Sequence, residues 1–73
     1  NARWRVELAG AYTQQGLIDR ALEQLEKAVN IDPEYGEARV LLSMIYRRLG
    51  RLEEAKVQLE EATRLGRRLN SIH

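Results

Sequence analysis

The sequence predicts an all-α fold, in which two antiparallel helix-turn-helix repeats stack as a short right-handed solenoid with a C-terminal tail or partial capping turn. Three observations predict it. The chain matches itself when it is shifted so that Arg5 falls on Arg39, its apolar residues recur every three to four positions, and glycines interrupt that pattern at corresponding places in both copies. A repeat period of about 34 residues indicates stacked helical hairpins.

The internal repeat divides a single domain, residues 1–73, into repeat one at 2–35, repeat two at 36–69 and a tail at 70–73. Ten positions are identical in the two repeats, and most of them carry small, aromatic or glycine residues that govern helix packing. The identical pairs are Arg5 and Arg39, Val6 and Val40, Leu8 and Leu42, Tyr12 and Tyr46, Gly16 and Gly50, Ala21 and Ala55, Gln24 and Gln58, Leu25 and Leu59, Glu26 and Glu60, and Ala28 and Ala62.

The ends of the helices are predicted from glycine, proline and acidic residues. Gly16 and Gly50 are expected to end the first helix of each repeat, because glycine adopts positive φ without strain. Asp19 is expected to cap the second helix, and Asp32 and Pro33 to begin the third, with Asp32 as N-cap and Pro33 at the first helical position. Four helices are therefore expected near residues 2–15, 18–31, 34–49 and 52–65.

The end of repeat two departs from the end of repeat one, because Gly66-Arg67 stands where Asp-Pro closes the first repeat. The fourth helix is expected either to stop at Gly66 or to run on into the tail. Leu69 and Ile72 are spaced to form an extra helical turn over the apolar residues of that helix. Without such a cover, the exposed face predicts self-association, by end-to-end stacking or by exchange of a hairpin. Two repeats are few, and we expect a fragment of a longer array.

Composition excludes several classes of function. The chain has no Cys and a net charge of +1, which argue against disulfides, thiolate metal sites and general nucleic-acid or membrane-surface binding. It contains no apolar run long enough for a membrane span and no leader, and its compartment is left open. The one histidine, His73, is read as a tail residue, and Ser43 as a packing residue without a neighbouring base. No catalytic, metal or cofactor site is expected, and the chain is not expected to be an enzyme.

Small and aromatic residues at fixed places in both repeats resemble the tetratricopeptide repeat family. The first repeat supplies Leu8-Ala9, Tyr12, Gly16, Ala21, Leu25, Ala28 and Pro33, and the second supplies Leu42-Ser43, Tyr46, Gly50, Ala55, Leu59 and Ala62. The resemblance covers residues 2–69. Arg5 and Arg39 depart from it, because the family usually has Trp or Leu there; a long Arg stem is able to pack in that place.

The resemblance implies a non-catalytic protein–protein interaction module that holds a peptide or partner helix in the concave groove formed by helices one and three. The positions that it implies on the groove are Arg3, Val6, Gly10, Thr13, Gln14, Glu37, Val40, Met44, Arg47 and Arg48. An acidic group of the partner is expected near Arg47, Arg48 or Arg51, because guanidinium groups offer forked donors to carboxylates. Some relatives use a Lys and Asn clamp for chaperone tails, which the residues at the matching positions do not predict here.

Two other functions stay open beside the interaction module. The first is an architectural or self-associating segment with no peptide ligand, so a homo-oligomer is a possible partner state. The second is RNA binding by the basic runs at 47–51 and 64–68, which the interleaved Glu residues and the near absence of aromatic residues from repeat two disfavour. Tyr12 and Tyr46 are expected in the core. Trp4 is expected either to pack within the chain or to form an exposed contact surface.

Overall fold

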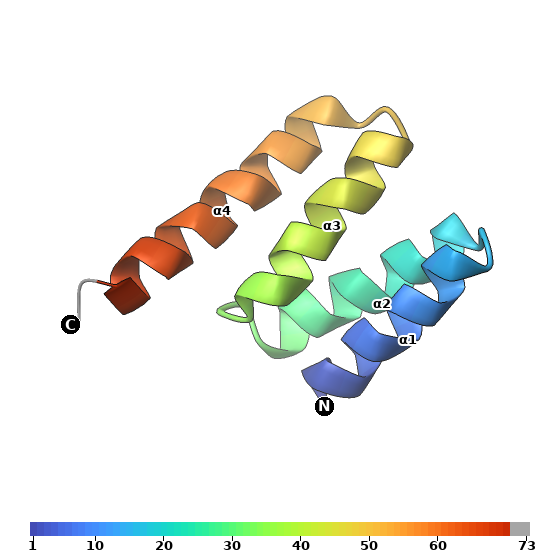
Figure 1. Cartoon of the computed structure of the whole chain (residues 1–73), viewed down its shortest axis with the longest axis horizontal. Helices are drawn as coiled ribbons and strands as arrows, with labels where there is room; N and C mark the ends of the chain where they lie inside the picture. Colours follow the sequence, from blue (N-terminus) through green and yellow to red (C-terminus); the bar gives the residue numbers. More distant parts are fainter. Residues whose placement is uncertain (71–73) are drawn as a thin grey trace.

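Four α-helices make up the computed structural model, which describes the backbone of residues 1–70 and the side chains of residues 1–68. They are α1 (Ala2–Gln14), α2 (Ile18–Ile31), α3 (Gly36–Arg48) and α4 (Leu52–Asn70). Helix α1 packs antiparallel to α2, α3 packs antiparallel to α4, and α2 joins the two hairpins by packing against α3 (Figure 1). The predicted all-α arrangement of two stacked hairpins is confirmed. Within residues 1–70 no helix is long and apolar enough to cross a membrane.

The core lies where α2 meets its two neighbours. Ala21 and Ala28 of α2 and Ala38 of α3 are completely buried, and Leu25 lies among them with almost no exposed surface. Small side chains at these places let the helices approach closely, while Leu25 fills the space that remains. The predicted core positions Tyr12 and Tyr46 also pack here, Tyr46 as a buried residue and Tyr12 as a partly buried one.

Each hairpin turns at a glycine with positive φ, as predicted. Gly16 has φ 79° and Gly50 has φ 77°. In the first turn the backbone N–H of Leu17 donates to the Tyr12 carbonyl at 2.9 Å, and that of Gly16 donates to the Thr13 carbonyl at 3.0 Å. The second turn repeats this pair of bonds, which satisfies carbonyl groups at the helix end that would otherwise have no helical partner.

The starts of α2 and α3 differ from the prediction. Leu17, rather than Asp19, is the N-cap of α2, because the chain becomes helical directly after the glycine and Asp19 already lies in the first turn. Asp32 is not the N-cap of α3 either. Its carbonyl accepts from the N–H of Tyr35 at 3.1 Å, so Asp32 to Tyr35 form a turn with Pro33 in the second position, where a fixed φ is favourable. Helix α3 then begins at Gly36 with Tyr35 as its N-cap.

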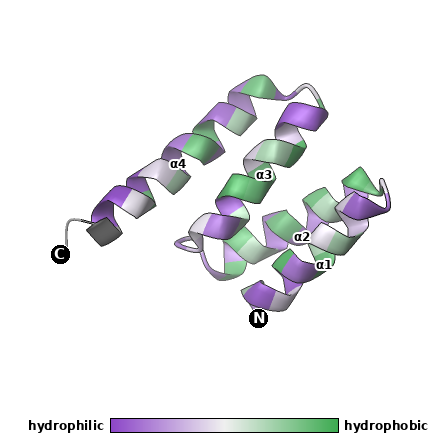
Figure 2. Ribbon diagram, in the orientation of Figure 1, coloured by the Kyte–Doolittle hydropathy of each residue, from purple (hydrophilic) through white to green (hydrophobic). Residues whose placement is uncertain are grey.

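Helix α4 continues through Gly66 to Asn70, so the second of the two expected outcomes holds. No Asp-Pro pair is present to break it, and the glycine lies inside the helix. Arg68 pairs with Glu34 in the turn before α3 at 3.0 Å, which ties the last turn of α4 to the junction between the repeats. The expected cover of α4 by Leu69 and Ile72 lies outside the described side chains. Figure 2 shows hydrophilic residues gathered toward this end of α4.

An arginine–glutamine pair stands in both repeats at the position where the family that the sequence resembles usually has Trp or Leu. Arg5 Nη1 donates to Gln24 Oε1 at 2.9 Å, and Arg39 Nη1 donates to Gln58 Oε1 at 2.8 Å. Both arginines are partly buried, so their stems fill space between the helices of a hairpin while their head groups are hydrogen-bonded. The long Arg stem therefore does pack in place of the family's usual residue.

Leu25 and Leu59 occupy the same place in the two repeats, but they are 1% and 49% exposed. Leu25→Ala is expected to lower the free energy of unfolding by about 2–5 kcal/mol, because it opens a cavity in the core. Leu59→Ala is expected to change it by less than about 1 kcal/mol, because the side chain is already half in water. Urea unfolding of the two variants measures the difference, and equal losses would show that α4 is covered in solution.

Gly50 and Gly66 predict opposite effects of the same substitution. Gly50→Ala is expected to destabilise the chain by about 1–2 kcal/mol, since an alanine at positive φ is strained. Gly66→Ala is expected to stabilise it by about 0.5–1 kcal/mol, because the new Cβ meets no atom within 4 Å and alanine favours the helix. Thermal unfolding followed by circular dichroism tests both, and a destabilised Gly66→Ala variant would contradict a continuous α4.

Candidate partner-binding site

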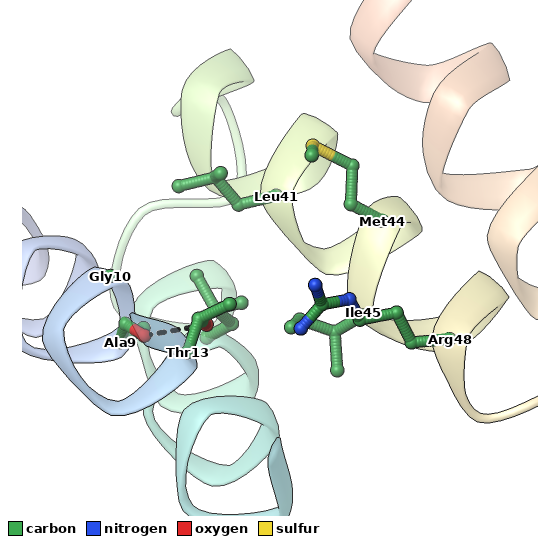
Figure 3. Close-up of a pocket in the computed structure, with 8 residues that line it drawn as sticks. Ala9, Gly10, Thr13, Leu41, Met44, Ile45 and Arg48 are labelled. Atoms are coloured by element: carbon green, nitrogen blue, oxygen red, sulfur yellow. Dashed lines mark hydrogen bonds between the residues drawn. The ribbon is translucent and has the colours of Figure 1, made fainter. Parts of the chain in front are cut away.

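An apolar hollow of about 180 Å³ lies between the two repeats on the side where α1 and α3 face each other. Its lining residues are Ala9, Gly10, Thr13, Leu25, Leu41, Met44, Ile45 and Arg48. Figure 3 shows Leu41 and Arg48 extending from α3 toward α1, with Thr13 on the opposite wall. The Thr13 hydroxyl donates to the Ala9 carbonyl at 2.8 Å, so the wall of α1 presents the methyl group of Thr13 rather than a free donor.

The hollow exists because α1 has no side chain at Gly10. A Cβ placed there would meet no atom within 4 Å, so the space in front of this residue is open. The corresponding residue of repeat two is Met44, whose side chain is exposed and flexible and which lines the same hollow from α3. One repeat therefore supplies the opening and the other supplies an adaptable apolar wall.

A second, more open hollow adjoins the first on the side of the α3–α4 turn. It is lined by Met44, Arg47, Arg48 and Leu52 and shares Met44 and Arg48 with the first. Leu52 is exposed, and the sequence interpretation did not include it, because it opens the second helix of the repeat rather than lying on the first. Leu41 and Ile45 were also missed, since they were not among the positions transferred from the resemblance.

Five of the predicted groove residues are thus brought together: Gly10, Thr13, Met44, Arg47 and Arg48. Val40 is partly exposed on α3, whereas Val6 is buried in the core, so only one of the two valines offers its surface to a partner. The difference follows from position in the chain. Repeat one is followed by α3, and repeat two is followed by no further helix in the part of the chain that the structure describes.

The remaining predicted residues lie outside the hollows of this groove. Arg3 pairs weakly with Glu7 at 3.9 Å near the start of α1, and Gln14 is exposed at the end of that helix. Glu37 accepts a hydrogen bond from the Tyr35 hydroxyl at 3.3 Å. None of these residues lines the two hollows where Arg47 and Arg48 lie.

The three arginines near the α3–α4 turn differ in their availability. Arg51 donates from Nε and Nη2 to the two carboxylate oxygens of Glu54, both at 2.7 Å, and its guanidinium lies 4.6 Å from the centre of the Tyr46 ring. This pairing lowers the pKa of Glu54, chiefly through the hydrogen bond from Arg51. Arg47 and Arg48 form no ion pair or hydrogen bond with any of the side chains at 1–68. They are the cations that remain able to bind a carboxylate.

Tyr46 links the groove helix α3 to α2. Its hydroxyl donates to Glu26 Oε2 at 3.1 Å, and Glu26 remains exposed. Burial raises the pKa of the Tyr46 phenol, and the hydrogen bond to Glu26 raises it further. The protonated phenol is therefore the form that the folded chain favours.

These features define an all-α repeat scaffold with an apolar hollow and an adjoining hollow lined by two arginines, and comparison with known proteins gives its family. A family model described as tetratricopeptide repeat matches residues 12–68. The chain is 38% identical over 56 residues to the inactive TPR repeat-containing thioredoxin TTL3 of Arabidopsis thaliana, a match that covers 77% of this chain and 8% of that protein. The chain belongs to the tetratricopeptide repeat family, whose repeats are typically non-catalytic and generally act as protein–protein interaction modules.

Tyr46→Phe is expected to lower the free energy of unfolding by about 0.5–1.5 kcal/mol at neutral pH, the usual net value of one hydrogen bond. Because the folded-state pKa is raised, this contribution is fully present below the unfolded-state pKa of about 10 and is lost as the pH rises through the folded-state value. Urea unfolding at neutral and alkaline pH should show the difference between the two proteins shrinking at high pH. Tyr12→Phe is the matched control, since Tyr12 is also partly buried and its hydroxyl forms no side-chain hydrogen bond within the described residues, and a pH-independent gap for Tyr46→Phe would contradict the assignment.

Proposed function

We propose that the concave face between α1 and α3 binds a short protein segment that places an apolar side chain in the hollow beside Gly10 and a carboxylate against Arg47 and Arg48. The chain acts in this proposal as a binding module without catalysis. The observation that carries it is the juxtaposition of an apolar hollow, lined in part by Arg48, with an adjoining hollow that Arg47 and Arg48 both line, because neither guanidinium group is paired. The family to which the chain belongs supports a protein as the kind of partner.

The sizes and chemistry of the two hollows suggest what such a segment contains. The first is almost wholly apolar, and its 180 Å³ suits one aliphatic or aromatic side chain. The second places Arg47 and Arg48 beside Met44 and Leu52, so an acidic residue there would be held by charge-assisted hydrogen bonds next to apolar surface. An apolar residue followed or preceded closely by Asp, Glu or a C-terminal carboxylate satisfies both.

RNA binding has less support than protein binding. Tyr46 is the one aromatic residue of repeat two, and it is buried under Arg51. No aromatic side chain lines either hollow, and unstacked bases need such platforms.

Selection from a displayed library of random linear peptides tests the proposal. Enriched sequences are expected to combine an acidic residue with a nearby large apolar one. For a selected peptide, Arg47→Ala and Arg48→Ala are each expected to weaken binding about tenfold, measured by calorimetric titration, through loss of a charge-assisted hydrogen bond. Gly10→Leu is expected to abolish binding by filling the hollow while leaving the helix intact, since the position has open space.

Arg20→Ala is the matched control, because Arg20 is an exposed arginine of α2 away from both hollows. It is expected to leave affinity unchanged. The proposal fails if the selected peptides carry no acidic residue, or if binding survives both Gly10→Leu and the loss of the two arginines. Raising the salt concentration should weaken the wild-type interaction and should have a smaller effect on the arginine variants.

A further inference from the structure

The chain exposes two outward faces that correspond to the two sides of its own internal interface. Ala38, Leu42, Ile45 and Tyr46 of α3 are all buried. Their counterparts at the same places of repeat one are Trp4, Leu8, Ala11 and Tyr12, all of them partly or largely exposed. Helix α3 packs against α2 as well as α4, whereas no helix precedes α1 among the residues that the structure describes, so we attribute this difference in burial to α2. We call the four α1 residues the α1 end face.

Helix α4 carries the other side of the same interface. A shallow hollow on it is lined by Lys56, Leu59, Glu60, Thr63, Arg64 and Arg67. In the register of the repeat, Glu60, Thr63 and Arg64 correspond to Glu26, Val29 and Asn30, which share a hollow with Leu42 and Tyr46 of α3. Leu59 corresponds to the buried Leu25. We call Leu59, Glu60, Thr63 and Arg64 the α4 end face; it has the place on α4 that the α3-binding surface has on α2.

The two end faces also carry the donor and the acceptor that correspond to one hydrogen bond of the α2–α3 interface. Across the internal interface, Tyr46 donates to Glu26 at 3.1 Å. The corresponding donor is Tyr12 on the α1 end face, and the corresponding acceptor is Glu60 on the α4 end face. Neither forms a side-chain hydrogen bond or ion pair within the described part of the chain. Two copies arranged head to tail would join Tyr12 to Glu60 as Tyr46 is joined to Glu26.

Trp4 is the residue that does not fit this arrangement. Its counterpart Ala38 is 0% exposed, so the internal interface leaves no room for an indole there. Trp4 instead is 48% exposed and lies 4.7 Å from the Arg5 guanidinium. The counterpart of Arg5 is Arg39, whose Nε donates to the Pro33 carbonyl of the turn before α3 at 2.9 Å. Arg5 Nε is buried without an acceptor, and the indole lies against the same guanidinium.

We propose that the α1 end face and the α4 end face are complementary halves of a head-to-tail interface between two copies of this chain, and that Trp4 keeps the interface closed. The two end faces are complementary because they occupy, in the two repeats, the positions that form the two sides of the α2–α3 interface. The indole fills the position at which the partner's α4 would have to approach. Since a head-to-tail contact does not close on itself, opening it would give assemblies of increasing length rather than a defined dimer.

Sedimentation velocity over a wide range of protein concentration tests the proposal. The wild-type chain is expected to sediment as a monomer. Trp4→Ala and Trp4→Ser are each expected to associate into a concentration-dependent series of species, with an affinity about tenfold or more tighter than any association of the wild type. Trp4→Phe retains the bulk and is expected to stay monomeric. Circular dichroism establishes that each variant keeps its helicity.

Two substitutions on α4, each made in the Trp4→Ala variant, test whether the α4 end face forms the contact between copies. Leu59→Arg is expected to return the variant to a monomer, because Leu59 lies on the α4 end face. Val57→Arg is the matched control: Val57 is 53% exposed, similar to Leu59, but it corresponds to Glu23, which remains exposed although α2 packs against α3. It is expected to leave association intact.

Three results would overturn the proposal. The first is a Trp4→Ala variant, or a Trp4→Ser variant if the alanine variant lost its helicity, that is as monomeric as the wild type. The second is association that persists in Trp4→Ala with Leu59→Arg. The third is a wild-type chain that associates as well as or better than Trp4→Ala, which would make the indole an anchor of self-association rather than a barrier.

Discussion

The whole arrangement depends on how closely α2 can approach the helices on either side of it. Alanines at positions 21, 28 and 38 have no exposed surface, and this close approach sets the stacking of one hairpin on the next. A larger side chain at any of them would force α2 away from a neighbouring helix, and any displacement of α3 would carry α4 with it. The groove inherits its shape from the same contact, because its apolar hollow is the space left between α1 and α3 when both lie against α2.

Much of this fold could be predicted from the sequence because residues with the same role in helix packing occur at the same positions of both repeats. The positive-φ glycines, the small residues of α2 and the hairpin pairing all followed from patterns that recur at the same places of both repeats. The starts of α2 and α3 could not be predicted in the same way. Asp19 and Asp32 are both suitable N-caps by residue type, but the backbone geometry of the glycine turn and of the Pro33 turn determines where α2 and α3 begin.

The candidate site was predictable in outline, but its detail depends on where each repeat lies in the stack. Val6 and Val40 are equivalent by sequence, yet one is buried and the other is partly exposed, and no local pattern distinguishes them. The same holds for the arginines near the α3–α4 turn: only the position of Glu54 and of the Tyr46 ring shows that Arg51 is engaged. Neighbours distant in sequence decide which predicted residues can meet a partner.

Helices α2 and α3 are packed on both sides, which affects where the chain unfolds locally. Each of these helices has a packed neighbour on two faces, whereas α1 and α4 each pack mainly on one. Local stability in proteins follows such contact density, so backbone amides of the inner pair should exchange with solvent through the least frequent openings. The outer helices can then loosen while the inner pair stays joined. Motions that reshape the groove wall formed by α1 are therefore available without unfolding the junction between the repeats.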